Sequence, residues 1–275
     1  MIHYTENQTT IHNGSAIATV IADTLSPYDN KRITTLELVY PRYIHSELMT
    51  HRVFSRNAAS SRATPLTVTV AEVANDPVFF DYVGVNQSGM VAGAELPPEK
   101  VEEFKREWEA LGLYVADTVA DWGKRYGIHK QTLNRALEPW SRIRTLVTAT
   151  EWDNFFKLRL AEDAQPEIRN LAVAMRDAMG KSEAVVGYYH RPYVTPEEVE
   201  ILNRHTLMNI SAARCARVSY ARHDGKPTDI KADLALADRL WDSGHYSPFE
   251  HMAIAEGGIH ANFIGWQSYR TANGE

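Results

Sequence analysis

Residues 50–62 read THRVFSRNAASSR and contain three arginines, a histidine, an asparagine and three serines. Such side chains hold phosphate groups and the polar edges of heterocycles. The stretch contains no Asp or Glu that could neutralise Arg52, Arg56 and Arg62. Two interpretations fit this pattern. It is either a nucleotide site in which an anion lies among the arginines, or an exposed basic loop whose serines cap nearby backbone groups.

The composition is that of an ordinary globular protein. The chain has 275 residues, of which 44% are hydrophobic and 23% are charged, enough for a sizeable core. A net charge of -6 argues against a nucleic-acid binder. We see no apolar run that spans a bilayer and no signal-peptide pattern. The single cysteine, Cys215, excludes an internal disulfide, so we expect a cytoplasmic protein that binds neither nucleic acid nor membrane.

Hydrophobic periodicity predicts a single α+β domain over residues 1–275. Strands are expected at 18–23 and 34–40, joined by a turn at 26–30, with strand-like composition again at 251–266. A helical turn or two and then a Ser/Arg loop are expected within 46–62. The other expected helices are 98–127 (ended by Gly127), one region within 151–178, one starting at Thr195 and Pro196, and 228–243 (capped by Thr228).

Three further stretches carry reactive side chains. EDAQPEIRNLA (162–172), with Arg159 before it, reads most simply as a helix with surface ion pairs. GHYSPFEHMAIA (244–255) has two histidines and a glutamate, which suggest a metal site by residue type. Their spacing differs from the H-E-x-x-H pattern, and a helix start with Glu250 near the positive end of the dipole is the alternative. Cys215 is either a nucleophile or a small buried residue.

Four motifs together resemble the flavin-dependent thymidylate synthases, the ThyX family. The family signature is R-H-R-x-x-S-x-N-x-x-S-x-R, and residues 50–62 keep every fixed position except the first, which is Thr50. The chain also contains AQPEIR at 164–169, ARVSY at 216–220 and GHYSPFEH at 244–251. The resemblance implies a twisted, largely antiparallel sheet flanked by helices. It also implies a homotetramer with active sites at subunit interfaces.

The order of these motifs differs from the family pattern. In the family the SPFEH segment precedes the signature, whereas here it comes last, so the resemblance implies a circular permutation. HMAIAEGGIHANFIGWQSYR (251–270) places Gln267 and Arg270 where the family has the Q-x-x-R that begins its signature. We expect these two residues to complete the site that Thr50 leaves incomplete.

The resemblance also implies the chemistry and the residues that serve it. FAD, NADPH as reductant and methylenetetrahydrofolate as one-carbon donor would convert dUMP to dTMP. Arg169 would be catalytic, because it would stabilise negative charge that develops on the uracil. The implied substrate-binding residues are Ser60, Ser61, Arg62, Arg142 (with Arg144 as its alternative), Arg169, Gln267 and Arg270. The implied cofactor-binding residues are His51, Arg52, Asn57, Arg159, His245 and Ser247, and no metal ligand is implied.

Two alternatives remain open. Ala58 stands where the family has a glutamate near nucleotide and flavin, with Glu47 as a candidate replacement. The same scaffold would then make another C5-modified pyrimidine nucleotide. It would either add a hydroxymethyl group or use dCMP as its substrate. The second alternative is a non-catalytic flavin- or nucleotide-binding protein, against which the retention of Arg62, Arg142 and Arg169 argues.

Overall fold

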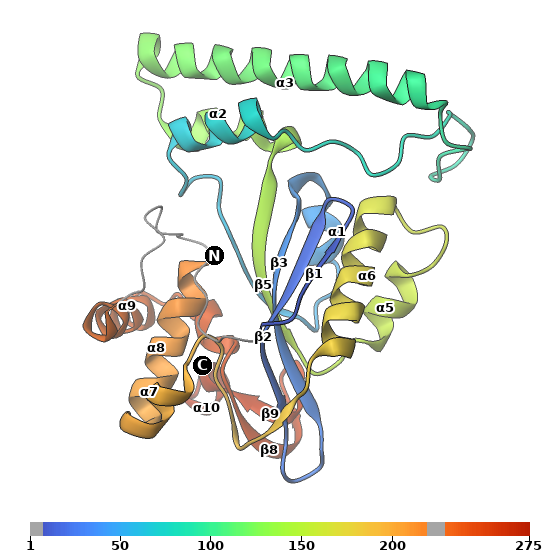
Figure 1. The fold of residues 1–275 in the computed structure, drawn as a ribbon. Coiled ribbons are helices and arrows are strands. Elements are labelled where there is room, and N and C mark those ends of the chain that lie inside the picture. The colour runs from blue at the N-terminus through green and yellow to red at the C-terminus, as the bar shows by residue number, and fades with distance from the viewer. Residues whose placement is uncertain (1–7, 219–228) are drawn as a thin grey trace.

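The computed structural model describes residues 8–218 and 229–275. At its centre lies a sheet in which β1, β2, β3, β5 and β4 are successive neighbours, while β6 pairs with the end of β2 (Figure 1). Every pair except β2–β6 is antiparallel, so the predicted α+β class with a largely antiparallel sheet is confirmed. The strands are β1 (Thr10–Asn13), β2 (Ala16–Leu25), β3 (Arg32–Pro41), β4 (Ser55–Ala58), β5 (Arg142–Ala149) and β6 (Val185–Val186).

The β2–β3 hairpin forms where the sequence predicts it. The N–H of Ser26 bonds the carbonyl of Lys31 at 3.0 Å, and its carbonyl accepts from the N–H of Asn30 at 3.0 Å. Asn30 has a left-handed φ of 57°, a conformation that asparagine adopts more readily than most residues. The turn residues therefore set the register of the two longest strands.

Helices α5 (Asp153–Arg159) and α6 (Pro166–Lys181) cover one face of the sheet (Figure 1). They confirm the helical region predicted within 151–178 and divide it in two. The α6 side chains that face the sheet recur at three-to-four spacing and belong to the largest core cluster: Ile168, Leu171, Ala172, Met175 and Met179. Leu36 and Leu38 of β3 belong to the same cluster. Each large apolar side chain buried there stabilises the fold by about 1.5–3 kcal/mol.

A helical layer crosses one end of the sheet (Figure 1). It consists of α2 (Leu66–Asn75), α3 (Pro98–Tyr126), α4 (Lys130–Leu133) and the 3-10 helix η2 (Asn134–Trp140). The predicted helix at 98–127 is confirmed, and Gly127 ends it with a left-handed φ of 64°. Gly112 lies against Trp140, where a Cβ atom would come within 2.8 Å of the indole ring. The layer therefore needs glycine at this position.

The C-terminal part carries a second sheet of order β7-β8-β9. The strands expected at 251–266 are confirmed as β8 and β9. The helix expected at 228–243 begins at Ile230 with Asp229 as its N-cap, and Thr228 lies outside the described residues. The elements are β7 (Tyr189–His190), α7 (Pro196–Ile201), α8 (Arg204–Arg217), α9 (Ile230–Asp242), the 3-10 helix η3 (Ser247–Glu250), β8 (Ala253–His260), β9 (Phe263–Ser268) and α10 (Tyr269–Ala272).

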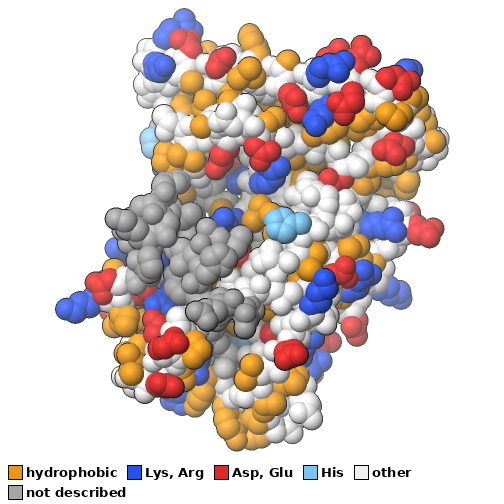
Figure 2. Space-filling model, in the orientation of Figure 1, with side chains coloured by type: hydrophobic (Ala, Val, Ile, Leu, Met, Phe, Trp, Pro, Cys, Tyr) orange, Lys and Arg blue, Asp and Glu red, His pale blue; other side chains and the backbone are white. Residues whose placement is uncertain are grey.

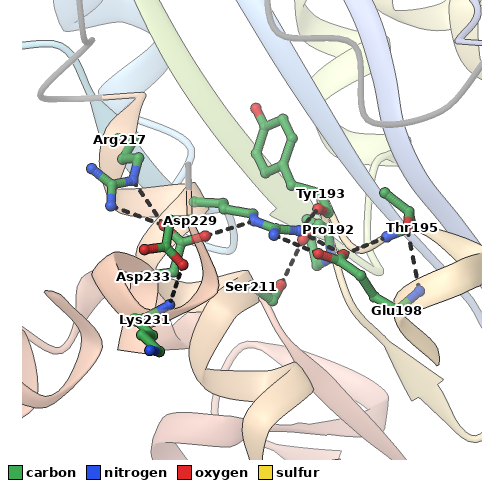
Figure 3. A network of polar contacts seen from close by, with 10 residues as sticks. Pro192, Tyr193, Thr195, Glu198, Ser211, Arg217, Asp229, Lys231 and Asp233 are labelled. Carbon is green, nitrogen blue, oxygen red and sulfur yellow. Dashed lines mark hydrogen bonds and ion pairs between the residues drawn. The ribbon is translucent and has the colours of Figure 1, made fainter. Parts of the chain in front are cut away.

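A buried ionic network joins α7, α8 and α9 (Figure 3). Arg214 pairs with Glu198 at 2.6 Å and with Asp233 at 3.0 Å, and Arg217 pairs with Asp233 at 2.9 Å. Glu198 also completes a capping box with Thr195, which confirms the predicted helix start. Because a buried charge without its partner is strongly destabilising, the network fixes how these helices pack.

A chain of hydrogen bonds joins the two sheets. His190 on β7 bonds Thr24 at 2.8 Å and Thr35 at 2.7 Å, and Thr35 bonds Thr148 at 2.6 Å. Thr148 in turn bonds Nδ1 of His251 at 2.8 Å. Both histidines are fully buried, and burial lowers the pKa of each to about 3. They are therefore neutral in the folded protein near pH 7.

The loop expected within the signature is partly a strand. Ser55–Ala58 form β4, which pairs with β5 from Ser55 opposite Thr148 to Ala58 opposite Thr145. Before it lie the 3-10 helix η1 (Arg42–Ile44) and α1 (His45–Met49), which is the short helix that the sequence predicts. Within the described ranges, no helix is long and apolar enough to cross a membrane.

Candidate active site

A cleft of about 770 Å³ lies between α2 and the ends of β3 and β5. In Figure 2 basic and acidic side chains face one another beneath the α2–α3 layer. The basic side chains that line the cleft are Arg42, Arg142 and Arg144. Ser61 also lines it, from the turn that follows β4. The cleft thus combines a residue of the signature with arginines from two central strands.

The two arginines of β5 already have acidic neighbours. Nη1 of Arg142 donates to Asp76 at 2.7 Å, and Nε of Arg144 lies 3.5 Å from Glu37. The side chain of Asp76 is 75% exposed, so this pair at the mouth of the cleft contributes little stability. An incoming anion can therefore replace Asp76 as the partner of Arg142 at small cost.

The end of the signature forms a tight turn at the edge of the cleft. The N–H of Arg62 donates to Oγ of Ser60 at 3.3 Å, and the side chain of Arg62 is exposed. Ser61 is 7% exposed, and its carbonyl accepts from Nδ2 of Asn134 at 2.7 Å. The structure brings Ser61 and Arg142 into one cleft, whereas Ser60 and Arg62 flank it.

A second cluster forms at the beginning of the signature. Nε of Arg159 donates to Nε2 of His51 at 2.9 Å, and its Nη2 donates to Oγ1 of Thr50 at 3.1 Å. Burial, and then the charges of Arg159 and Arg56, lower the pKa of His51. The ring is therefore neutral and accepts this bond. Arg52 is exposed and follows His51 directly, so two guanidinium groups at this end of the signature can donate to an anion.

Asn57 of β4 contacts Cys215 of α8. Nδ2 of Asn57 donates to the carbonyl of Cys215 at 2.9 Å. Cys215 is fully buried, and burial raises the pKa of its thiol well above the usual value. The thiol is therefore protonated and shielded, which favours the interpretation of a small buried residue over that of a nucleophile.

The GHYSPFEH segment contributes exposed and paired side chains. His245 is exposed and shares a 2.8 Å hydrogen bond with Ser243, and Ser247 is exposed at the start of η3. His251 bonds Thr148 instead of facing His245, and the described residues contain no group of three His, Cys, Asp or Glu able to hold a metal ion.

The C-terminal Q-x-x-R residues lie close to this segment. Nη1 of Arg270 donates to Glu250 at 2.7 Å, and its guanidinium lies 5.3 Å from the ring centre of Tyr246. Gln267 is half-buried on β9, opposite Ile254. Glu250 in turn acts electrostatically on Arg56 of β4. Arg270 is thus linked to Arg56 of the signature strand through their shared neighbour Glu250. Neither Gln267 nor Arg270 lines the cleft.

Arg169 lies on the first turn of α6 with its side chain exposed and outside the cleft. The sequence predicted surface ion pairs among the charged residues of 162–172. This prediction is wrong for Glu167, whose exposed fraction is only 2%. Glu167 accepts from the hydroxyl of Tyr43 at 3.1 Å and from the N–H of Asp81 at 3.0 Å. These contacts come from distant segments and fix the start of α6, and with it the position of Arg169.

Sequence reasoning missed two residues that line the cleft, Arg42 and Asn134. Arg42 directly follows the apolar strand β3, and a charged residue at the end of a buried strand is a signal that could have identified it. Asn134 lies within helical sequence and gave no such signal.

A model of the family described as thymidylate synthase complementing protein, Thy1, matches residues 25–182. The match covers more than half of the chain. The chain belongs to this family. The signature and AQPEIR lie within the matched residues, whereas ARVSY, GHYSPFEH, Gln267 and Arg270 lie beyond them. The predicted family resemblance is confirmed, and the circular permutation stays a prediction.

Two solved structures of ThyX from Helicobacter pylori, both with FAD and dUMP, are among the similar structures. Each is 20% identical to this chain, and each alignment covers 54% of this chain and 67% of the other, with TM-scores of 0.39 and 0.36. No curated protein matches this chain.

Proposed function

We propose that this protein is a flavin-dependent thymidylate synthase that converts dUMP to dTMP. Methylenetetrahydrofolate supplies the one-carbon unit and NADPH reduces the FAD. The observation that carries the proposal is the family match over residues 25–182, which contain both the signature and the arginines of the cleft. The FAD and dUMP bound to the Helicobacter pylori enzymes are consistent with it.

The nucleotide phosphate is proposed to bind at the cleft. Ser61 lines it from the turn after β4 and Arg142 lines it from the start of β5. Ser60 and Arg62, on either side of Ser61 in the chain, are proposed as further contacts. A dianionic phosphate displaces Asp76 from Arg142 and gains charge-assisted hydrogen bonds from guanidinium and hydroxyl donors. Phosphate binding then fixes the position of the uracil ring.

The flavin is proposed to bind beside His51, Arg52, Asn57 and Arg159, with His245 and Ser247 as further contacts. The donor set fits this group, since Arg52 and Arg159 are cationic and His51 is held neutral. When bound, FAD supplies the hydride and carries the one-carbon unit. His51 and Arg159 orient it, and their aromatic surroundings, such as Phe54 and Phe155, exclude water.

Arg169 is proposed to stabilise negative charge on the uracil carbonyl during attack on the ring. It does not line the cleft of its own chain, and we propose that a second copy of the chain brings it to the nucleotide. This arrangement needs at least two copies of the chain, and it is consistent with the homotetramer that the family resemblance implies. It also leaves Gln267 and Arg270 available to complete a site in a neighbouring subunit.

One feature favours a second candidate reaction. Ala58 packs against the core and carries no carboxylate. Glu47, its candidate replacement, accepts a hydrogen bond from the hydroxyl of Ser46 at 2.9 Å. If the loss of this carboxylate changes the reaction, the enzyme would make a hydroxymethylated nucleotide or would act on dCMP instead of dUMP.

Binding of FAD followed by dUMP tests the proposal. The purified protein is saturated with FAD and titrated with dUMP while the visible flavin spectrum is recorded. We expect FAD to bind and dUMP to perturb its spectrum, because the two ligands share one site. Failure to bind FAD, or a spectrum insensitive to dUMP, would contradict the proposal.

A further inference from the structure

Three buried polar atoms that line the cleft lack a hydrogen-bond partner among the described residues. They are Nε of Arg42, Oγ of Ser61 and Oδ1 of Asn134. A buried polar atom without a partner is rare and destabilising in a folded protein. Three such atoms around one cavity therefore indicate a polar ligand. The set offers a cationic donor, a hydroxyl group and a carbonyl acceptor.

Arg42 is the most exceptional of the three. Its backbone N–H donates to the carbonyl of Ser141 at 2.9 Å, which fixes the residue at the end of β3. Its Nη1 and Nη2 both reach only the carbonyl of Ala59, each at the long distance of 3.4 Å. It forms no ion pair with any carboxylate of the described chain, and burial lowers the pKa of its guanidinium.

The acidic residues of the cleft do not neutralise this charge. Glu138 is bonded to Arg135 at 2.9 Å and Asp76 to Arg142 at 2.7 Å. Glu138 and Glu72 raise the pKa of Arg42 through their fields, but desolvation outweighs them. A desolvated guanidinium of this kind gains most from an anion that offers it two oxygens.

Asn134 defines the other side of the subsite. Its Nδ2 donates to the carbonyls of Ser61 at 2.7 Å and Thr64 at 3.0 Å, which holds the turn after β4 in place. Only its Oδ1 remains to interact with a ligand, and this atom requires a donor. A ligand that satisfies the whole set is therefore a phosphate monoester that also carries a hydroxyl group.

We propose that Arg42, Ser61 and Asn134 form the nucleotide subsite of the cleft. Arg42 binds the phosphate, Ser61 donates to it, and Asn134 accepts from a sugar hydroxyl. The identity of the ligand as a pyrimidine nucleoside monophosphate rests on the proposed function, whereas the phosphate subsite rests on the cleft alone. Arg42 thereby gains the counterion that the protein does not supply.

The test compares Arg42→Met with the wild-type protein and with Arg176→Met. Arg176 is a half-exposed arginine of α6, paired with Asp177 outside the cleft, so its replacement removes one charge without touching the subsite. Calorimetric titrations use inorganic phosphate, dUMP and deoxyuridine, and thermal unfolding is measured without ligand.

We expect Arg42→Met to weaken phosphate and dUMP binding by about 10- to 100-fold and to leave deoxyuridine binding unchanged. Its unliganded melting temperature should equal or exceed that of the wild type, because a desolvated cation has been removed. Arg42→Lys should recover only part of the affinity, since it keeps the charge but loses the planar fork. Arg176→Met should behave as the wild type.

The outcomes separate the subsite from the proposed function. Unchanged phosphate affinity in Arg42→Met, or loss of its fold without ligand, would overturn the subsite. If phosphate binding depends on Arg42 but the protein does not bind dUMP, the result would support the subsite and contradict the proposed function. A wild-type protein that binds neither ligand would overturn both.

Discussion

Nε of Arg159 donates a hydrogen bond to Nε2 of His51 over 2.9 Å and so joins α5 to the start of the signature. The two residues are 108 positions apart, and the sequence implied a flavin contact for both. Arg159 also holds the carbonyl of Glu47 at 3.3 Å and Oγ1 of Thr50 at 3.1 Å. It therefore orients this part of the signature as well as offering positive charge to a ligand.

Replacing Arg159 should weaken flavin binding. We expect Arg159→Met to raise the Kd for FAD by about 10- to 100-fold, because it removes charge-assisted hydrogen bonds. Quenching of flavin fluorescence on binding measures the change. Lys157→Met, an exposed change on the same helix, is the control. Equal FAD affinity in the Arg159 variant and the control would show that this cluster is not a flavin site.

Replacing Arg169 should affect turnover and not flavin binding. Loss of one group that stabilises developing negative charge should lower kcat by about 10²- to 10³-fold, while the affinity for FAD is retained. Steady-state dTMP formation and a flavin titration measure the two effects. Arg176→Ala, further along α6, should keep normal turnover. Normal turnover in Arg169→Ala would refute the role given to Arg169.

Mixing two inactive variants should restore activity if active sites lie between subunits. Arg62→Ala and Arg169→Ala each remove one part of the proposed site, so hybrid assemblies contain some intact sites. For a site built from two chains, random mixing leaves about a quarter of the sites intact. The variants are unfolded and refolded together, and dTMP formation is compared with that of each variant refolded alone. Absence of recovery would mean that both residues serve a site within one chain.

The buried histidines should make the protein unstable in acid. His190 and His251 have folded-state pKa values lowered from 6.5 to about 3 by burial. Below about pH 6.5 the unfolded chain binds protons that the folded state excludes. The contribution of the two histidines to the free energy of unfolding is thus complete above pH 6.5. It falls by about 1.4 kcal/mol per pH unit for each histidine as the pH drops toward 3.

Urea unfolding between pH 7 and pH 4.5 measures this loss. In His190→Gln the chain should take up about one proton fewer on unfolding, so the free energy of unfolding should depend less steeply on pH. This holds whatever the effect of the substitution on stability at pH 7. His12→Gln, at an exposed position on β1, is the control. A wild-type slope in the His190 variant would show that His190 does not titrate on unfolding.

Local patterns in the sequence predicted the elements that local chemistry determines. The β2–β3 hairpin follows from β-branched residues around a turn at Asn30, and α3 follows from its periodicity and Gly127. The pairing of β4 with β5 was not predictable in this way, because the two strands are distant in the sequence. The four residues of β4, Ser55–Ala58, also show no clear alternation of apolar and polar side chains.

The same limit applies to the candidate site. The family motifs implied roles for His51, Arg159 and Ser61, and these roles stay predictions. The burial of Glu167 depends on Tyr43 and Asp81, which arrive from other parts of the chain. Likewise, Arg42 and Asn134 gain significance only because folding leaves their polar atoms buried around one cavity.

The central claim is tested most directly by mass spectrometry of the nucleotide product. The protein is incubated anaerobically with FAD, NADPH and methylenetetrahydrofolate, with dUMP in one sample and dCMP in another. We predict that a methyl group is added to dUMP, giving dTMP, and that dCMP is unchanged. A hydroxymethylated product, reaction only with dCMP, or no product from flavin-loaded protein would contradict the claim.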